Sequence, residues 1–441
     1  MRLAAVQPDG MIDRARPDDL LELAVDRGPV PWQVGALLVL DRALTPSEVR
    51  RALAERVQAV PRLRRKLVRT PPLCGRPIWV DDPDFSVEHH VREVSVPGSD
   101  RTTLFDVAIA AVGSRVSLRR PPWEVVVVSG GEGDRGALVL VFHHVLADGI
   151  GGLAALAQLV DGAPPAEDRS FPRRPPTTRA LAVDALRARA AVLAHLPRAL
   201  RQLHDAVREL RSTRAPRAPR SSLDCPTGSR RVLRAVRTDL AAVREAAHRR
   251  GGTVNDVVLA TVGGVLGALL ARRGETVDDV VVSVPISARR RTTADQVGNA
   301  VGVLPVAVPT TGPAEARLAT VARRTAGRDQ SPRAASAPLL DAGFRLVAAT
   351  GALPWLLDHQ HLVTTFVTNL RGPATPLAFL GARVVDLIPI TTTTGNVPVV
   401  FGAFSYAGAL TITVVADPDG CPEVDDLVDD LRRELAEVQS P

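Results

Sequence analysis

Short apolar runs that suit strands alternate with stretches that suit helices along the N-terminal half of the chain. Residues 32–41 and 137–142 are apolar and rich in β-branched side chains, so they predict buried strands. The run 121–130 predicts a third strand, joined to 137–142 by a turn that glycines bound. Residues 47–58 repeat apolar positions at helical spacing and predict an amphipathic helix. We therefore expect a sheet flanked by helices in this half.

The C-terminal half repeats this mixture. Residues 232–239 predict a strand, and the helix that follows ends at Gly251 and Gly252. A second helix, rich in small residues, starts near Asn255, and residues 280–290 predict another buried strand. Strands and helices alternate through the remainder, so this half is also mixed α and β.

A segment of different composition separates the two halves. Residues 166–230 carry Pro-rich and Arg-rich ends around a basic helical middle, which is typical of an interdomain connection. We therefore place an N-terminal domain at 1–165 and a C-terminal domain at 231–441. The apolar positions of the helical middle can pack on a domain with the arginines pointing outward, or can lie on an anionic membrane surface. Packing is the favoured interpretation.

Length and composition agree with two globular domains. At 441 residues the chain exceeds the size at which single cores usually stop growing. Hydrophobic residues make up 45% and aromatic residues only 3%, so Val, Leu and Ala must fill the core. The net charge of +7 comes largely from arginine, which suits a basic surface, an anionic membrane or nucleotide phosphates. Nucleic acid is not expected as a partner, because no nucleic-acid-binding motif accompanies the charge.

Cysteine spacing and apolar stretches bear on the location of the protein. Cys74, Cys225 and Cys421 lie far apart without CxxC spacing, which argues against a zinc cluster and a disulfide framework. The N-terminus has no sustained apolar run, and the longest apolar stretch, 257–271, is shorter than the roughly 20 residues of a membrane span. We expect a cytoplasmic protein with neither a secretion signal nor a transmembrane helix.

The stretch FHHVLADGIGG, residues 142–152, carries the strongest chemical signal. It places His143 and His144 at the end of an apolar run, followed by Asp148 and Gly149 at the start of a helical pattern. Histidine titrates near neutral pH, so a histidine at a strand end can remove a proton from an alcohol or amine that attacks an acyl carbon. We assign this role to His144, with His143 settling the backbone and the tautomer and Asp148 organising the turn.

Other interpretations of these histidines stay open. His144 and Asp148 could bind a metal ion together, although no third ligand of matching spacing accompanies them. The histidines could also simply satisfy hydrogen bonds in a core. A second pair, His89 and His90, is not followed by Asp-Gly at the same spacing and is expected to be structural. We expect no metal site.

The HHxxxDG pattern of residues 143–149 resembles the CoA-dependent acyltransferase superfamily, which includes chloramphenicol acetyltransferase, carnitine acyltransferases and nonribosomal peptide condensation domains. Further stretches resemble successive blocks of the bacterial wax ester synthase/diacylglycerol acyltransferase family, in order and over nearly the whole chain. These blocks are LAVDRGPVPWQVGALLVLD, VPRLRRKLV, PIWVDDPDFSVEHHVREV, RRPPWEVVVV, GTVNDVVLATVGG, VPISARR with VGNAVGVLPV, VTNLRGPATPL and FSYAGALTITVVADP.

The resemblance implies an α/β fold of two chloramphenicol-acetyltransferase-like domains, each a mixed sheet flanked by helices, with a tunnel between them. Acyl-CoA would enter from one side as a co-substrate, with no bound cofactor, and the acceptor alcohol would enter from the other. His144 would be the general base for direct attack of the hydroxyl on the thioester, without a covalent acyl-enzyme. Asp148 would be mainly structural, and Gly149 would leave room for substrate close to the backbone.

The resemblance also implies that residues outside the motif support the site. Asn255 and Asp256 would lie across the domain interface, and Trp123, Asn369 and Ser405 would lie near the substrate. Some of them have a simpler interpretation. Trp123 suits the edge of a sheet, Asn255 suits a helix cap, and the stretch around Asn369 suits an irregular bend.

Three positions depart from the family pattern. Pro122 stands where a PLW-like element has leucine, residues 23–26 read Leu-Ala-Val-Asp in place of an SPLD-like element, and Ala300 stands where the family often has arginine. These departures leave the core reaction in place. They bear on the acyl-chain length and on the acceptor.

The function implied is O-acyl transfer from acyl-CoA to a long-chain alcohol or diacylglycerol, which gives wax ester or triacylglycerol. The protein would be cytoplasmic, with peripheral contact to the inner membrane or to lipid droplets. One alternative is a tailoring acyltransferase that acts on a polar natural-product hydroxyl or amine. The other is a noncatalytic lipid-binding homologue.

Overall fold

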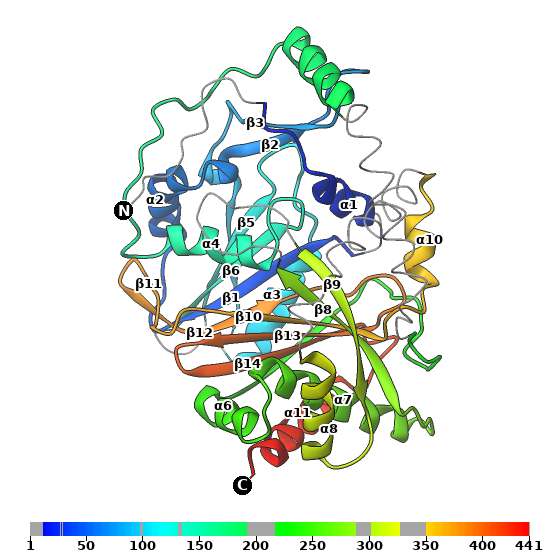
Figure 1. Cartoon of the computed structure of the whole chain (residues 1–441). Coiled ribbons are helices and arrows are strands. Elements are labelled where there is room, and N and C mark those ends of the chain that lie inside the picture. Colours follow the sequence, from blue (N-terminus) through cyan, green and yellow to red (C-terminus); the bar gives the residue numbers. More distant parts are fainter. Residues whose placement is uncertain are drawn as a thin grey trace.

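The computed structural model describes residues 12–26, 28, 30–97, 100–130, 135–191, 217–287, 301–326 and 350–440. They form two α/β domains, each built on a six-stranded sheet that helices flank (Figure 1). This confirms the predicted fold class. Ala300 lies outside the described residues, as do residues 192–216 of the predicted connection.

The strands and helices that the apolar pattern predicts are present in the predicted order, among further elements. The first part of the chain forms α1 (Pro17–Val25), β1 (Gln33–Leu40), α2 (Pro46–Arg56), η1 (Val57–Ala59), η2 (Pro61–Arg64), β2 (Arg65–Val68), β3 (Ile78–Asp81), η3 (Val87–His89), β4 (Val91–Ser95), α3 (Arg101–Gly113), β5 (Trp123–Ser129), β6 (Gly136–His143) and α4 (Gly149–Leu159). The second part forms β7 (Val232–Asp239), α6 (Leu240–Arg249), α7 (Val254–Arg272), β8 (Asp279–Ser287), β9 (Val301–Pro309), α8 (Ala314–Thr325), α10 (Leu353–Asp358), β10 (Thr365–Arg371), β11 (Ala378–Phe379), β12 (Ala382–Ile390), β13 (Val399–Tyr406), β14 (Ala409–Ala416) and α11 (Val424–Gln439).

The first sheet is layered between helices, and β6 lies inside it. Its strand order is β11-β12-β1-β6-β5-β4. Side chains of a strand point alternately to opposite faces. Leu140 and Phe142 pack in one cluster with α2 and α4, whereas Val139 and Val141 pack in another with α3. By this alternation His143, the last residue of β6, falls on the α3 side of the sheet.

Two strands join the first sheet from far along the chain. β12 pairs antiparallel with β1, with Leu37 opposite Ile388, and β11 pairs with the outer side of β12. The region predicted as the C-terminal domain, 231–441, therefore contributes to the sheet that carries the histidines. An apolar run identifies a strand but not the strand it pairs with. The sequence pattern therefore does not predict that β12 pairs with β1.

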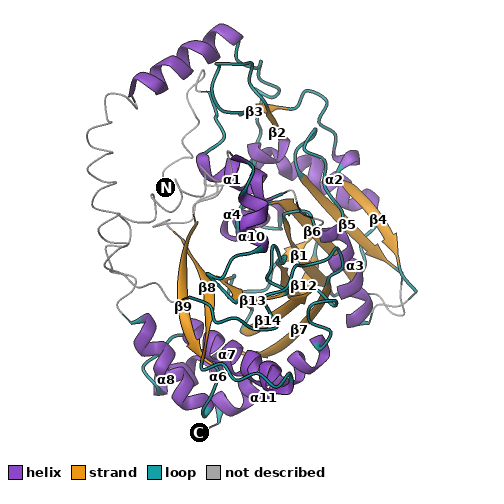
Figure 2. Ribbon diagram, turned by 90° about the vertical axis from the view of Figure 1, so that its right-hand side faces the viewer, coloured by secondary structure: helices purple, strands orange, loops and turns teal. Residues whose placement is uncertain are grey.

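The second sheet meets the first domain on one face and its own helices on the other. Its strand order is β7-β14-β13-β10-β8-β9. Helices α6, α7, α8 and α11 gather beneath it (Figure 2). On the opposite side, Leu233, Val400 and Val415 share one apolar cluster with α3. The two domains are thus joined by a common core.

Helix α7 is long and apolar enough to cross a membrane, but 72% of its apolar window is buried inside the protein. Its small residues allow close packing. A Cβ atom on Gly263 would lie 2.4 Å from the carbonyl oxygen of Pro309, and one on Gly267 would lie 2.3 Å from that of Thr310. Strand β9 and the residue after it therefore lie directly against the glycine face. This is the position of a core helix.

Candidate active site

The two histidines of the motif lie where β6 ends and α4 begins. β6 pairs antiparallel with β1, and the backbone amide of His144 donates to the carbonyl of Trp32 at 3.0 Å. Asp148 is the N-cap of α4, and its Oδ1 accepts a hydrogen bond from the amide of Gly151 at 2.7 Å. The predicted strand, turn and helix start are present, and the Asp148 carboxylate serves the helix start.

His143 is fully buried, and both of its ring nitrogens are engaged. Nδ1 accepts a hydrogen bond from the backbone amide of Val145 at 3.0 Å, so this nitrogen carries no proton. The proton therefore lies on Nε2, which donates to Oδ2 of Asp26 at 3.1 Å. These two bonds fix the ring and its tautomer and leave neither nitrogen to accept a substrate proton.

Asp26, at the C-terminal end of α1, gathers several donors. Besides His143, the backbone amide of Trp32 donates to its carboxylate at 2.8 Å, and Arg115 forms an ion pair with it. Burial alone would raise the pKa of the Asp26 carboxyl. The hydrogen bonds from His143, Trp32 and Arg115 outweigh burial, so the pKa lies below its ordinary value of 3.8. Asp26 is a charged anchor between α1 and the end of β6.

His144 lies against an aromatic ring and a carboxylate. Its side chain is 20% exposed, and its ring stacks on Trp32 with centroids 5.3 Å apart and planes 17° apart. Nδ1 lies 3.6 Å from Oε2 of Glu22. The Trp32 indole donates a hydrogen bond to the same Glu22 oxygen. One carboxylate thus orients the indole and sets a negative charge beside the imidazole.

The second domain approaches the motif through β10. A Cβ atom on Gly149 would lie 2.7 Å from Cδ1 of Leu370, so the glycine makes room for this leucine. The next residue back, Asn369, donates from Nδ2 to Oδ1 of Asn255 at 3.3 Å, which links β10 to α7. Gly149, Asn369 and Asn255 therefore belong to one region where the two domains meet.

Asp256 serves the start of α7. Thr253 is the helix cap, and a reciprocal pair of bonds joins it to Asp256: Oδ2 of Asp256 accepts from the Thr253 amide at 2.7 Å, and the Thr253 hydroxyl accepts from the Asp256 amide at 3.3 Å. Oδ1 of Asp256 accepts from the Thr325 hydroxyl at 2.7 Å. The helix-cap interpretation of Asn255 is therefore wrong, because Thr253 holds that position.

Trp123 is a core residue of the first domain. It begins β5, which lies between β4 and β6, so the sheet-edge interpretation is wrong. Its indole donates to the carbonyl of Leu63 at 2.8 Å, and its ring stacks on His90 at 4.3 Å. Burial lowers the pKa of His90 to about 4, and Nδ1 of the neutral ring donates to the Trp123 carbonyl at 2.9 Å. His90 is structural, as predicted.

Ser405 lies near the end of β13, where hydrogen bonds connect this strand to the end of β10 and to β12. It is buried, and its carbonyl accepts a hydrogen bond from the amide of Gly372 at 2.9 Å. The hydroxyl of the next residue, Tyr406, donates to the carbonyl of Val384 at 2.8 Å. β10 continues through Asn369 to Arg371 as a regular strand, so the bend predicted around Asn369 begins only at Gly372.

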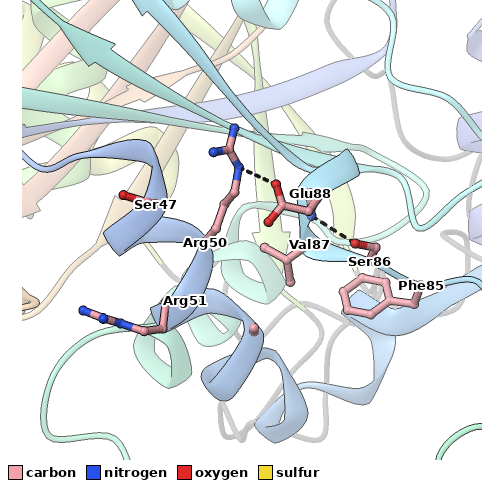
Figure 3. A pocket seen from close by; sticks show the side chains of 8 residues that line it. Ser47, Arg50, Arg51, Phe85, Ser86, Val87 and Glu88 are labelled. Carbon is pink, nitrogen blue, oxygen red and sulfur yellow. Dashed lines mark hydrogen bonds and ion pairs between the residues drawn. The ribbon is translucent and has the colours of Figure 1, made fainter.

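Two surface cavities lie away from the motif. Figure 3 shows one of about 520 Å³ between α2 and η3, in which Arg50 pairs with Glu88 at 3.0 Å while Arg51 points away from that pair. The other, of about 460 Å³, lies beside Arg101 at the opposite end of β6. His144 lines neither of these two cavities. The interdomain tunnel therefore stays a prediction.

The geometry around His144 also bears on a metal site. Within the described ranges, no group of three or more His, Cys, Asp or Glu side chains is placed to hold a metal ion. The carboxylate of Asp148 caps α4, and Nδ1 of His144 faces Glu22. The side chains of Asp148 and His144 therefore contact different parts of the protein.

The sequence interpretation gives no site role to four residues that surround the histidines: Glu22, Asp26, Trp32 and Arg115. A signal for Trp32 was present, because antiparallel pairing of the apolar runs 32–41 and 137–142 sets the first residue of one run beside the residues that follow the other. Glu22 and Arg115 carry no such signal. Their places depend on how α1 and the segment after α3 pack on the strand ends.

Family models match most of the chain. The wax ester synthase/diacylglycerol acyltransferase catalytic domain matches residues 16–258, and the C-terminal domain of the same family matches residues 297–439. The protein named probable diacylglycerol O-acyltransferase tgs1 in Mycobacterium tuberculosis is 29% identical over 424 residues, which cover 90% of this chain and 88% of that protein. A Mycobacterium bovis protein with a similar name matches at 29% identity over 424 residues.

Solved structures share the fold. The wax ester synthase/diacylglycerol acyltransferase of Marinobacter aquaeolei VT8 gives a TM-score of 0.69 at 22% identity and covers 97% of this chain and 98% of its own. The first condensation domain of the CDA synthetase gives a TM-score of 0.61 at 19% identity, with coverage of 98% and 97%. The fold is therefore the chloramphenicol-acetyltransferase-like one that wax ester synthases and condensation domains share. Within that class, the chain belongs to the wax ester synthase/diacylglycerol acyltransferase family and is an acyltransferase.

Proposed function

We propose that this protein transfers a fatty acyl group from acyl-CoA to the hydroxyl of a long-chain alcohol or of diacylglycerol, giving wax ester or triacylglycerol. The family match over residues 16–258 supports this proposal, as do relatives named as diacylglycerol O-acyltransferases. Acyl-CoA acts as a co-substrate that is consumed in each turnover. The observation that carries the proposal is the position of His144, at a strand end near the domain interface with Glu22 facing its Nδ1.

His144 is the general base in this proposal. Its Nε2 accepts the hydroxyl proton while the hydroxyl oxygen attacks the thioester carbonyl carbon. The tetrahedral intermediate collapses, the carbon–sulfur bond breaks, and the coenzyme A sulfur receives the proton from His144. No bond forms between the protein and the acyl group. Base catalysis of this kind contributes about 10²–10⁴ in rate, so positioning of the two substrates supplies much of the rest.

Glu22 and Trp32 prepare His144 for this step. When His144 accepts a proton it becomes a cation, and the Glu22 carboxylate 3.6 Å from Nδ1 stabilises that cation. The stacked indole of Trp32 restricts rotation of the imidazole, and Glu22 in turn holds the indole. His143 does not take part in the proton transfer, because Val145 and Asp26 occupy both of its nitrogens. His143 is thus a positioning residue.

Release of coenzyme A that depends on an acceptor tests the proposal. Purified protein is given palmitoyl-CoA together with hexadecanol, dioleoylglycerol or a short polar alcohol, and both free thiol and ester are measured. We expect thiol release with hexadecanol or dioleoylglycerol, matched by ester formation. Release with the polar alcohol alone would instead support a tailoring acyltransferase, and no release with any acceptor would support a noncatalytic lipid-binding protein.

A further inference from the structure

The cavity beside Arg101 lies where the two domains meet, far from the histidine motif. Its lining comes from the first sheet, from α3 and from β7 of the second sheet. α3 and β7 lie side by side (Figure 2). Gly136 lines the cavity at the start of β6 and His143 ends the same strand, so at about 3.3 Å per residue the two positions are roughly 20 Å apart. The cavity is therefore separate from the histidine site.

The inner wall of this cavity is apolar. Leu37 and Val39 of β1, Ile388 of β12 and Phe105 of α3 contribute to it. The same side chains belong to, or pack against, the apolar cluster that joins the two domains. Val39 is half-buried, whereas the other three are buried, so the wall is fixed by the core behind it. The volume of about 460 Å³ falls within the range of about 300–1,000 Å³ that is usual for small-molecule sites.

The two acids of the lining already have partners within the protein. Asp386 pairs with Arg101 at 3.0 Å. Asp100 is the N-cap of α3, and its Oδ1 accepts hydrogen bonds from the amides of Thr102 and Thr103 at 2.9 and 3.1 Å. Each carboxylate thus serves the local structure, and neither is paired with a further arginine of the lining.

Two further arginines line the cavity, one from each domain. Arg135 precedes β6, and Arg237 lies in β7. Both side chains are exposed and therefore lie at the mouth of the cavity, and within the described ranges no acid forms an ion pair with either. A guanidinium group presents several N–H donors in a fork that matches a carboxylate or a phosphate. The cavity thus combines an apolar inner wall with a cationic mouth.

We propose that this cavity binds an amphipathic anion, an apolar chain of medium length that carries a carboxylate or phosphate head. The chain contacts Val39 and Phe105 on the inner wall, and the head lies between Arg135 and Arg237. A neutral alcohol would leave both guanidinium groups without an anion. A small inorganic anion would leave the apolar wall in contact with water.

The bound anion would contact both domains, because Arg135 belongs to the first and Arg237 to the second. A ligand that binds only the folded protein stabilises it, so the anion would also strengthen the junction between the domains. This site goes beyond the proposed acyl transfer and does not depend on it, since neither histidine of the motif lines the cavity.

Calorimetric titration of the full chain tests the proposal. The probes are octanoate and octyl phosphate, with octanol as the neutral analogue and acetate as the head without a chain. We expect at least one of the two amphipathic anions to bind about tenfold or more tightly than octanol and acetate, and salt to weaken its binding. Binding of octanol or acetate as tight as that of both amphipathic anions would overturn the proposal.

Two variants locate the site. Arg135→Gln with Arg237→Gln removes both charges at the mouth and is expected to weaken binding of the amphipathic anion about fivefold or more. Val39→Phe places a larger side chain at the inner wall and is expected to weaken binding to a similar extent. The two arginines are exposed, so the first variant keeps the fold even if the second is destabilised, and urea unfolding of both checks this.

Matched controls change the same residue types elsewhere. Arg187→Gln with Arg244→Gln removes two exposed arginines outside the cavity, and Val68→Phe enlarges an exposed valine of β2. Both controls are expected to bind the amphipathic anion like the parent protein. Binding at the parent level in the folded Arg135 and Arg237 variant would contradict the proposal.

Turnover of palmitoyl-CoA with hexadecanol, measured in parallel, separates this site from the proposed acyl-transfer site. If octanoate bound only in the acyl-transfer site, it would inhibit turnover, and its binding would be equal in the parent and in both cavity variants; this result would overturn the proposal. Absent turnover in the parent, with anion binding that the arginine variant loses, would remove the proposed function and leave the anion site standing.

Discussion

The Nε2 atom of His143 lies 3.1 Å from Oδ2 of Asp26, and this bond separates the roles of the two adjacent histidines. His143 is buried with both nitrogens occupied, whereas His144 is partly exposed and stacks on Trp32. The two adjacent histidines thus differ. Both ring nitrogens of His143 are occupied by hydrogen bonds, whereas Nδ1 of His144 lies beside the carboxylate of Glu22. Only the second suits proton transfer to and from a substrate.

Replacement of Asp26 by Asn tests the anchoring of His143. The variant is expected to lose about 1–3 kcal/mol of unfolding free energy at neutral pH, because a buried acceptor of several hydrogen bonds loses its charge. The folded-state pKa of Asp26 is depressed, so its contribution is complete above the ordinary value of 3.8 and is lost as pH falls through the lower folded value. The variant should therefore show a flatter dependence of stability on pH in that acidic window. Urea unfolding from neutral to acidic pH measures both effects.

Replacement of Glu22 by Gln tests the charge beside His144. Glutamine keeps the shape and still accepts a hydrogen bond from the Trp32 indole, but it removes the charge that stabilises the imidazolium. We expect kcat to fall about tenfold with little change in KM. The Glu22 charge stabilises His144 only once His144 has taken the substrate proton, and this step follows substrate binding. Glu22→Ala should lower kcat further.

Glu55, an exposed carboxylate of α2, provides the matched control for this variant. Glu55→Gln removes the same charge at a distance and should keep the parent kcat. If Glu22→Gln and Glu55→Gln behave alike while both remain folded, Glu22 does not act on His144. A rise in KM alone would place Glu22 in substrate binding.

Replacement of Gly149 by Ala tests the contact between the domains. The new Cβ would lie 2.7 Å from Cδ1 of Leu370, so the leucine must move and β10 must shift or its side chain must turn. Overpacking of this kind costs about 1–3 kcal/mol. We expect lower acyl transfer and lower stability, and partial recovery of both when Leu370→Ala is added. No recovery in the double variant would mean that Gly149 is needed for another reason, such as space for substrate.

His90 should make the protein sensitive to mild acid. Its pKa is about 4 in the folded protein against an ordinary value of 6.5, so between these values the unfolded state binds a proton that the folded state does not. Stability therefore falls as pH falls through this window, by at most on the order of 3 kcal/mol. His90→Gln removes this dependence. Parallel unfolding curves of the two proteins across the window would show that His90 does not titrate in this way.

The apolar pattern predicts the elements that carry the site well. The strand, turn and helix around His143, His144 and Asp148 depend on local periodicity and on a helix cap, and both are readable along the chain. The same is true of the glycine-rich helix α7 in the second domain. Fold class follows from the alternation of such elements in both halves.

Contacts between distant segments are not readable in this way. The return of β12 to the first sheet, the approach of Leu370 to Gly149 and the position of Glu22 beside His144 all depend on packing between elements far apart in sequence. The cap of α7 is a different case, because both Thr253 and Asn255 suit a cap and the reciprocal bonds that favour Thr253 join it to Asp256, only three residues away. The Thr-x-x-Asp pattern of residues 253–256 was therefore readable from the sequence.

The comparison of His144→Ala with His89→Ala tests the central claim most directly. His89 is the exposed member of the other histidine pair, so its replacement controls for the loss of a histidine. With palmitoyl-CoA and an excess of the best acceptor, we expect the His144 variant to lose at least about 10²-fold in ester formation and the His89 variant to match the parent protein. Both variants should unfold at the same urea concentration as the parent. Ester formation by a folded His144→Ala variant at the parent rate would contradict the account.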